Sequence, residues 1–203
     1  MGNIIVVTNR KLSIEPFERR IERLVRLDIN RIILREKDLS PTEYYFLAKK
    51  IIKICEEYGV NLMLHTHIGV ARKLGHNKIH VPIAGIDEVK DFETVGSSCH
   101  FLSDAKKSEE AGADYITFGH VFETECKKGL APRGLDKLSK VCRGISLPVY
   151  AIGGMTPNKY ASVLNAGARG CIMSSAMIDD NVEKLVKDFN NIEEKYRDGR
   201  KQI

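Results

Sequence analysis

The stretch VYAIGGMTPNKYASVLNAGARGCIM, residues 149–173, holds one complete strand–helix–strand unit. It begins with the apolar run Val149–Ile152 and ends with a second apolar run, Gly170–Met173. Between them the pattern predicts a helix over Pro157–Ala166, because Thr156 is a suitable cap and proline is favoured at the first helical position. A strand, a helix and a second strand in this order predict a parallel βαβ unit.

The same alternation fills the rest of the chain. Short β-branched runs also predict strands at Ile4–Val7, Ile32–Leu34, Leu62–Leu64, Ile79–Val81, Thr94–Ser98 and Tyr115–Phe118. Helical patterns lie over Pro16–Leu27, Pro41–Tyr58, Ala71–Leu74, Asp87–Phe92, Ala105–Ala111, Leu135–Cys142 and Val182–Tyr196. The charged tail Glu193–Ile203 is expected to fray after the last helix.

Eight strand–helix units in 203 residues predict a compact (β/α)8 TIM barrel, a single domain over residues 1–203. A doubly wound open sheet is the alternative, because periodicity does not show whether the sheet closes. No GxGxxG follows the first strand, which disfavours a dinucleotide-binding domain.

The composition is that of an ordinary globular protein, with 43% apolar and 29% charged residues. No apolar run approaches the ~18 residues of a membrane helix, and Ile4–Val7 is too short for a secretory signal, so we expect a cytoplasmic protein without membrane association. The five cysteines form no CxxC pair, which favours reduced thiols. The net charge of +5 suits an anionic ligand, but the basic residues form no long block, so nucleic-acid binding is not expected.

Polar residues or glycines stand at the carboxyl end of every predicted strand, where the chemistry of a barrel gathers. The loops after the seventh and eighth strands are the usual phosphate site of such barrels. Two residues without Cβ let an anion approach backbone N–H groups, and hydroxyls follow the next strand. We therefore predict phosphate binding by Gly153, Gly154, Ser174 and Ser175; a tight turn and a buried serine pair are the alternative.

The stretch YITFGHVFETECKKGLAPRG, residues 115–134, carries the most reactive loop. His120 follows an apolar strand and precedes cationic residues that include Arg133 and Lys127, and Lys127 is also a candidate substrate-binding residue. An imidazole titrates near neutral pH and can both take and return a proton, so we predict that His120 is the catalytic acid/base. A hydrogen-bonded structural histidine is the alternative.

Other strand ends supply candidate substrate-binding groups. Arg35 and Lys37 could hold a substrate anion with Glu36 orienting one of them, or could belong to a solvated ion pair. An anion contact is favoured over nucleophilic chemistry for Ser98 and His100. His65 and His67 lack an obvious third ligand, so no metal site is expected, and His76 and His80 are expected at the surface or behind the site.

Five motifs together resemble one superfamily over roughly Ile4 to Met177. They are LREK at 34–37, GSSCH at 96–100, FGHVFET at 118–124, AIGGMTP at 151–157 and SSAM at 174–177. Their order is similar to that of the thiamine phosphate synthase and thiazole tautomerase superfamily. Of its two branches, the synthase joins a pyrimidine diphosphate to a thiazole phosphate with magnesium. The tautomerase (TenI-like) aromatises a thiazole carboxylate phosphate tautomer without metal or cofactor.

Three departures from the synthase pattern favour the tautomerase branch. No carboxylate stands at His65-Thr66 or over Val81–Ala84, where the synthase has its magnesium ligands. Residues 124–127 read TECK and lack the second threonine of the synthase's Thr-x-Thr-Lys. Gly119-His120 replaces the synthase's Gly-Pro and matches the tautomerase.

The resemblance therefore implies a thiazole tautomerase of thiamine biosynthesis, an isomerase that binds a phosphorylated thiazole. Its acid/base matches His120, and its phosphate site matches Gly154, Ser174 and Ser175. Lys37 and Ser98 match positions that line the synthase's pyrimidine and diphosphate region, and here they would face the substrate carboxylate.

Three other activities stay open. They are thiamine phosphate synthase, a non-catalytic barrel that binds a phospho-thiazole and regulates a partner, and a barrel phosphate isomerase or epimerase. Barrels of this type often pair, so a homodimer is one expectation, although no residue in the sequence shows it.

Overall fold

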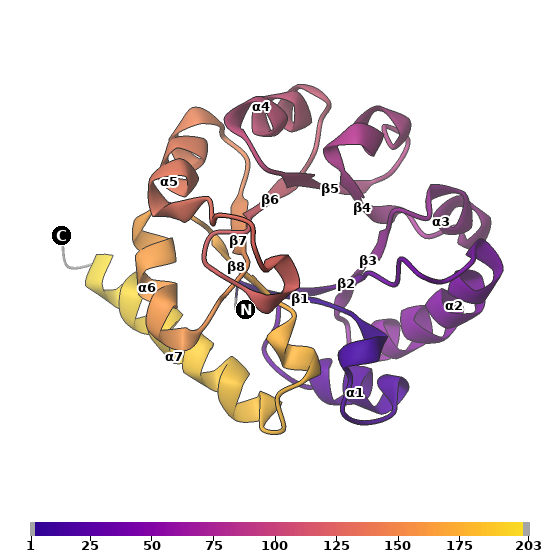
Figure 1. The fold of residues 1–203 in the computed structure, drawn as a ribbon. Helices are drawn as coiled ribbons and strands as arrows, with labels where there is room; N and C mark the ends of the chain where they lie inside the picture. Colours follow the sequence, from indigo (N-terminus) through magenta and orange to yellow (C-terminus); the bar gives the residue numbers. More distant parts are fainter. Residues whose placement is uncertain (1–2, 201–203) are drawn as a thin grey trace.

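The computed structural model describes residues 3–200, which form a closed barrel of eight parallel strands in chain order, surrounded by helices (Figure 1). The last strand pairs with the first through Ile4↔Cys171, Ile5↔Ile172 and Val6↔Met173. The predicted TIM barrel is confirmed, and this pairing excludes an open sheet. The strands are β1 (Ile4–Val7), β2 (Arg31–Leu34), β3 (Asn61–His65), β4 (Lys78–Pro82), β5 (Thr94–Cys99), β6 (Tyr115–Gly119), β7 (Val149–Ile152) and β8 (Gly170–Met173).

Seven α-helices of the described residues form the outer ring. They are α1 (Phe17–Leu24), α2 (Pro41–Glu57), α3 (Ile68–Leu74), α4 (Leu102–Glu110), α5 (Gly134–Gly144), α6 (Pro157–Asn165) and α7 (Val182–Arg200). Four 3-10 segments join them: η1 (Arg10–Leu12), η2 (Ile83–Glu88), η3 (Glu125–Lys127) and η4 (Ser175–Met177).

Two of the helix predictions are wrong. No helix covers 87–92; the link after β4 is instead η2, which begins directly after Pro82 and buries Ile86. The tail does not fray at Glu193, because α7 continues to Arg200. The Glu193 carboxylate is buried and accepts hydrogen bonds from the backbone and side chain of Asn3 and from the Tyr160 hydroxyl, which holds α7 against the barrel.

The barrel has two apolar regions, as the period-two alternation of strands requires. One lies between the sheet and the helices. The other fills the barrel interior with side chains from alternate strand positions: Ile5, Val7, Ile33, Met63, Tyr115, Tyr150, Ile152 and Ile172. Residues two positions further along each strand face the same way, so they reach the carboxyl end of the barrel.

The second helix supports that end. Its Ser40 cap and Glu43 form a reciprocal capping box, and Pro41 occupies the first turn, as the sequence predicts. Tyr44 of α2 is fully buried; its hydroxyl donates to the Leu34 carbonyl at 2.7 Å and accepts from the His65 amide at 3.0 Å. One side chain therefore joins the ends of β2 and β3.

Within residues 3–200, no helix has the length and apolarity needed to cross a bilayer. Cys55, Cys99, Cys142 and Cys171 are free thiols, and these are the cysteines whose side chains the structure describes.

Candidate active site

His120 is the first residue after β6, and its side chain is half-buried. Its Nε2 lies 3.2 Å from the carbonyl oxygen of Leu130. A carbonyl can only accept, so Nε2 carries the proton of the neutral imidazole and Nδ1 has the lone pair. This arrangement leaves a base on one side of the ring and a fixed donor on the other.

Gly153 and Gly154 pack directly against the chain that carries His120. A Cβ on Gly153 would lie 2.3 Å from the Cβ and 2.7 Å from the Cα of His120, and one on Gly154 would lie 2.3 Å from the Glu123 carbonyl oxygen. Both glycines have positive φ, +98° and +64°. Packing and backbone conformation therefore already require glycine at both positions. Phosphate binding by this pair stays a prediction that no contact tests.

The loop from β6 to α5 folds back over its own start. Its backbone returns through Arg133 N–H to the His120 carbonyl at 2.9 Å and Gly134 N–H to the Val121 carbonyl at 3.1 Å. The Arg133 guanidinium lies 4.5 Å from the centre of the Phe101 ring. In Figure 1 the loop crosses the middle of the ring of helices. The loop therefore holds the backbone of His120 in place, and the same loop carries Lys127 in η3.

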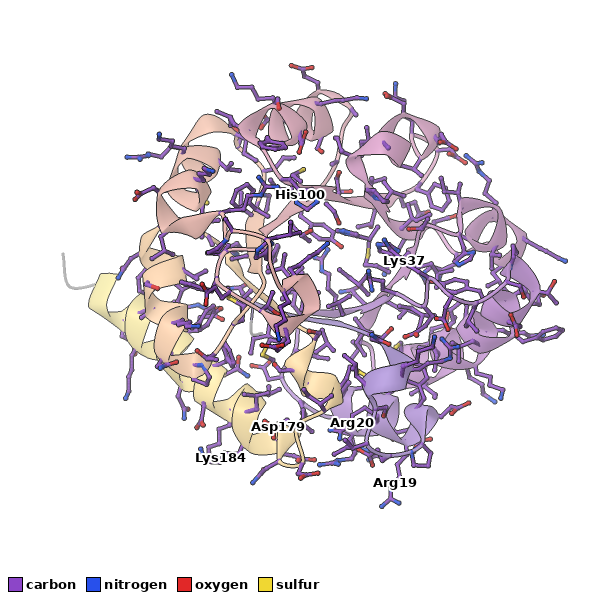
Figure 2. All side chains as sticks on the ribbon, viewed as in Figure 1. Arg19, Arg20, Lys37, His100, Asp179 and Lys184 are labelled. Carbon is purple, nitrogen blue, oxygen red and sulfur yellow. The ribbon has the colours of Figure 1, made fainter. Side chains whose placement is uncertain are left out.

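Two basic residues, Arg35 and Lys127, lie near enough to Lys37 at this end of the barrel for their charges to affect it. Partial burial lowers the pKa of Lys37, and the nearby positive charges of Arg35 and Lys127 lower it further. Lys37 and His100 both lie inside the ring of helices in Figure 2. Side chains that repel each other in this way are stabilised by an anion placed among them.

The prediction that Glu36 orients Arg35 or Lys37 is wrong. Glu36 is buried and accepts from the Thr8 hydroxyl at 2.6 Å and from the Arg10 amide at 3.0 Å. The Glu36 carboxylate therefore bonds to residues that follow β1, and not to the side chains of Arg35 or Lys37.

Ser98 and His100 have fixed partners. Ser98 is half-buried, and its Oγ lies 2.8 Å from His80 Nε2. His100 is exposed, and its Nδ1 donates to the Gly119 carbonyl at 2.7 Å, which anchors the end of β6. Ser174 and Ser175 are half-buried and stand at the start of η4, in the loop beside the glycine pair because β7 and β8 are neighbours.

Three polar residues of the barrel interior were not expected to face inward from the sequence. His80 is 2% exposed, so the expected surface position is wrong, and its contact with Ser98 is consistent with the alternative, a place behind the candidate site. His65 and Thr117 are also buried. A signal was available for two of them: His65 and Thr117 lie two positions after Met63 and Tyr115, which face inward, and strand side chains alternate. No interior apolar residue of β4 gives this signal for His80.

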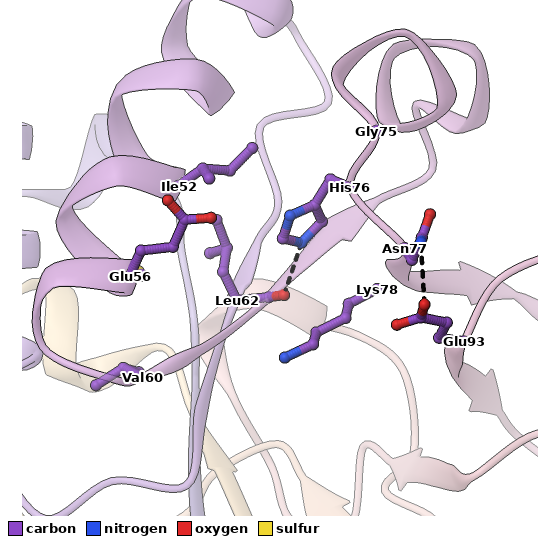
Figure 3. A pocket seen from close by; sticks show the side chains of 10 residues that line it. Ile52, Glu56, Val60, Leu62, Gly75, His76, Asn77, Lys78 and Glu93 are labelled. Carbon is purple, nitrogen blue, oxygen red and sulfur yellow. Dashed lines mark hydrogen bonds between the residues drawn. The ribbon is translucent and has the colours of Figure 1, made fainter.

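A separate cavity of about 200 Å³ lies at the opposite end of the barrel, between the end of α2 and the starts of β3 and β4 (Figure 3). Its polar side chains already bond within the lining: His76 to the Leu62 carbonyl, Asn77 to Glu93, and Lys78 to Asn61 just outside it. The carboxyl ends of the strands are the better candidate site, because the unpaired base and the clustered cations are there.

The comparison with known proteins identifies the family. Residues 4–177 match the family model described as thiamine monophosphate synthase. The chain belongs to the thiamine monophosphate synthase family. A putative thiamine-phosphate synthase 2 of Aquifex aeolicus is 31% identical over 84% of this chain and 94% of its own. The thiamine-phosphate synthase of Fusobacterium nucleatum is 28% identical over 92% and 97%.

Among solved structures, thiamine phosphate pyrophosphorylase from Pyrococcus furiosus matches with a TM-score of 0.84 and 25% identity, covering 96% of each chain. The family resemblance expected from the motifs is therefore confirmed. The relatives are named as synthases, so these comparisons do not distinguish the tautomerase branch.

The magnesium that synthase chemistry uses does not fit the residues at the strand ends. Among residues 3–200, no group of three or more His, Cys, Asp or Glu side chains is arranged to hold a metal. The Glu36 carboxylate accepts hydrogen bonds from the Thr8 hydroxyl and the Arg10 amide. The Asp38 carboxylate accepts hydrogen bonds from both terminal guanidinium nitrogens of Arg10. After β4 the chain continues through Pro82 into η2, whose first residues are Ile83 and Ala84. Magnesium prefers oxygen ligands such as carboxylates, and Pro82, Ile83 and Ala84 supply no carboxylate.

Proposed function

We propose that this member of the family is a thiazole tautomerase. Its substrate would be 2-carboxy-4-methyl-5(2H)-thiazolylidene ethyl phosphate, and its product the aromatic thiazole carboxylate phosphate. The observation that carries the proposal is the Nε2–Leu130 hydrogen bond of His120, which leaves Nδ1 as a base at the barrel opening.

The substrate has two anionic groups, and the barrel end has two places that suit them. The loops of Gly153-Gly154 and Ser174-Ser175 are proposed for the phosphate, on the precedent of barrels in general. The carboxylate would lie among the cations Arg35, Lys37 and Lys127, whose mutual repulsion an anion would relieve. Bound in this way, the thiazole ring would lie between the two anion sites, near His120.

The reaction needs one base that later acts as an acid. Nδ1 of His120 takes the proton from ring carbon C2, and the electron pair of that bond forms the C2=N3 double bond. The former N3=C4 pair becomes C4=C5, and the exocyclic double-bond pair takes a proton back from His120. Aromaticity makes the reaction downhill, and cations near the carboxylate stabilise the negative charge that develops beside it.

The test is turnover of His120→Ala, measured by NMR as loss of the C2 proton and formation of the aromatic ring. Removal of a general acid/base is expected to cost about 10²- to 10⁴-fold in turnover. Product binding, measured by calorimetry, should persist. His76→Ala, a histidine change at the opposite end of the barrel, is the matched control and should keep wild-type turnover. Near-normal turnover in His120→Ala would refute the mechanism.

Thiamine phosphate synthase is the second candidate, because the relatives carry that name. It predicts condensation of the pyrimidine diphosphate with the thiazole phosphate in the presence of magnesium, with release of pyrophosphate. Condensation without any C2 proton exchange would favour the synthase. Product binding without either reaction would favour a regulatory barrel.

A further inference from the structure

A line of polar side chains crosses the barrel interior. It begins at Arg31, at the amino-terminal end of β2, and ends at Ser98, near the carboxyl end of β5 and the candidate site. The Arg31 guanidinium lies over the Tyr115 ring, 4.2 Å from its centre. The Tyr115 hydroxyl lies 3.0 Å from His80 Nδ1, and His80 Nε2 lies 2.8 Å from Ser98 Oγ. Tyr115 and His80 are buried, and Ser98 is half-buried at the top of the line.

The chemistry of each group gives the line a direction. Burial raises the pKa of Tyr115, against smaller opposing effects from the charge of Arg31 and from its hydrogen bond to the phenol. The hydrogen of a buried phenol needs an acceptor, and His80 Nδ1 lies 3.0 Å from the Tyr115 oxygen, so the neutral phenol donates its hydrogen to His80 Nδ1. Burial, and then the charge of Arg31, lowers the pKa of His80 to about 3. A neutral His80 that accepts at Nδ1 carries its proton on Nε2 and donates it to Ser98.

The Ser98 hydroxyl oxygen therefore accepts a hydrogen bond from His80. Its Oγ receives the bond from His80 and a longer one, 3.4 Å, from the Thr117 hydroxyl. A hydroxyl oxygen has two lone pairs, and these two bonds use both of them. Ser98 can therefore form a further hydrogen bond only as a donor, through its own hydrogen. That hydrogen points away from its two donors, and Ser98 lies next to the carboxyl end of β5, where a substrate atom could accept it.

The line has no room to rearrange. A Cβ on Gly96 would lie 2.3 Å from the Tyr115 ring, 2.4 Å from its hydroxyl oxygen and 2.4 Å from His80 Nδ1. The missing side chain at Gly96 is thus the space in which the phenol meets the imidazole. Close packing at Gly96 limits the movement of the Tyr115 ring and the His80 imidazole, and aligned hydrogen bonds strengthen one another.

We propose that His80 and Tyr115 are positioning residues, which hold the Ser98 hydroxyl as a hydrogen-bond donor toward the substrate anion that the sequence already predicts near Ser98. The inference deepens the proposed function, because the anion is taken to be the carboxylate of the thiazole. Arg35 and Lys37 would supply the charge at that site, and Ser98 the directional bond.

A double-mutant cycle tests the coupling, with affinity for thiazole carboxylate phosphate measured by calorimetry. Ser98→Ala removes the donor and should weaken binding about 10- to 100-fold, the range for a bond to a charged group. Tyr115→Phe keeps the ring but removes the hydroxyl, and should weaken binding about 3- to 10-fold. The double variant should bind within about twofold of Ser98→Ala, because Tyr115 acts only through Ser98.

Tyr150→Phe is the matched control. Tyr150 is a second buried tyrosine of the barrel interior, and its ring centre lies 5.7 Å from that of Tyr115. The hydrogen bonds of His80 and Ser98 described above do not involve Tyr150. Its variant should leave affinity unchanged. Losses that simply multiply in the double variant, or a loss in Tyr150→Phe equal to that in Tyr115→Phe, would overturn the proposal.

The direction of the line has its own readout. Nitrogen NMR of the imidazoles, with His80 assigned from the spectrum of His80→Gln, should show the proton on Nε2 in the wild type and a shift toward Nδ1 in Tyr115→Phe. A wild-type His80 protonated on Nδ1 would overturn the relay whatever the activity is. Failure of the tautomerase assay with the proton on Nε2 would instead count against the proposed function alone.

Discussion

Replacing Gly153 by alanine should displace His120, the residue proposed here as the acid/base. The new Cβ would lie 2.3 Å from the Cβ and 2.7 Å from the Cα of His120, and 3.3 Å from the Val121 amide nitrogen. Carbon atoms in contact lie about 3.5–4.0 Å apart, so the two segments must separate by more than about 1 Å. His120 cannot move without stretching the bonds of Val121 to Ile152 and of Phe122 to Gly153.

Two terms set the expected loss of stability. An L-residue at positive φ costs roughly 1–2 kcal/mol, and overpacking of a close contact adds about 1–3 kcal/mol. We therefore expect the free energy of unfolding to fall by about 2–5 kcal/mol in Gly153→Ala. A displacement of about 1 Å at a reacting group costs about 10²-fold, so turnover should fall by that factor even where the variant is fully folded.

Gly112→Ala is the matched control. Gly112 also has positive φ, +84° against +98° for Gly153, but no atom lies within 4 Å of its added Cβ. It should lose only the conformational cost and keep its turnover. Urea unfolding followed by circular dichroism gives the stabilities, and the NMR assay gives turnover at a temperature where both variants are folded. If Gly153→Ala behaves like Gly112→Ala in both measurements, the reasoning about the contact with His120 is wrong.

Three further predictions concern buried polar groups. Burial is the largest cause that lowers the pKa of His65 to about 2 and of His80 to about 3, so both stay neutral when folded. Unfolded imidazoles bind a proton near pH 6.5, so stability is full above about pH 6.5 and falls toward pH 3, by up to about 1.4 kcal/mol per pH unit and imidazole. Urea unfolding against pH should show a shallower slope for His80→Gln, and an unchanged slope would contradict this. Tyr44→Phe leaves a β2 carbonyl and the His65 amide unpaired and should cost about 1–3 kcal/mol; a cost below about 0.5 kcal/mol would show that the hydroxyl is not needed. Glu193→Gln replaces an acceptor oxygen that faces the donors of Asn3 and should cost about 1–3 kcal/mol in the same measurement, whereas wild-type stability would mean that α7 is held by its apolar face alone.

Local sequence signals were sufficient where the structure depends on neighbours along the chain. The run Val149–Ile152 is a strand within its predicted limits, because apolar β-branched residues stop at a glycine pair. The start of α2 at Pro41 agrees with its cap for the same reason. The tail beyond Glu193 was misjudged because its charged composition looks solvated, and only the contact with Asn3, 190 positions away, shows that the carboxylate is buried.

Some features of the candidate site follow from the sequence, and others are seen only in the folded structure. The sequence alone determined that His120 follows a buried strand, that cations follow β2 and β6, and that glycines end β7. Only the tertiary structure decided that the sheet closes, that Glu36 turns away to Thr8, and that Gly153 presses on His120. It also decided the line from Tyr115 through His80 to Ser98, whose members lie 35 and 18 positions apart. Periodicity sets which face of a strand a residue occupies, whereas the partner it meets across the barrel depends on closure and register, which are properties of the assembled sheet.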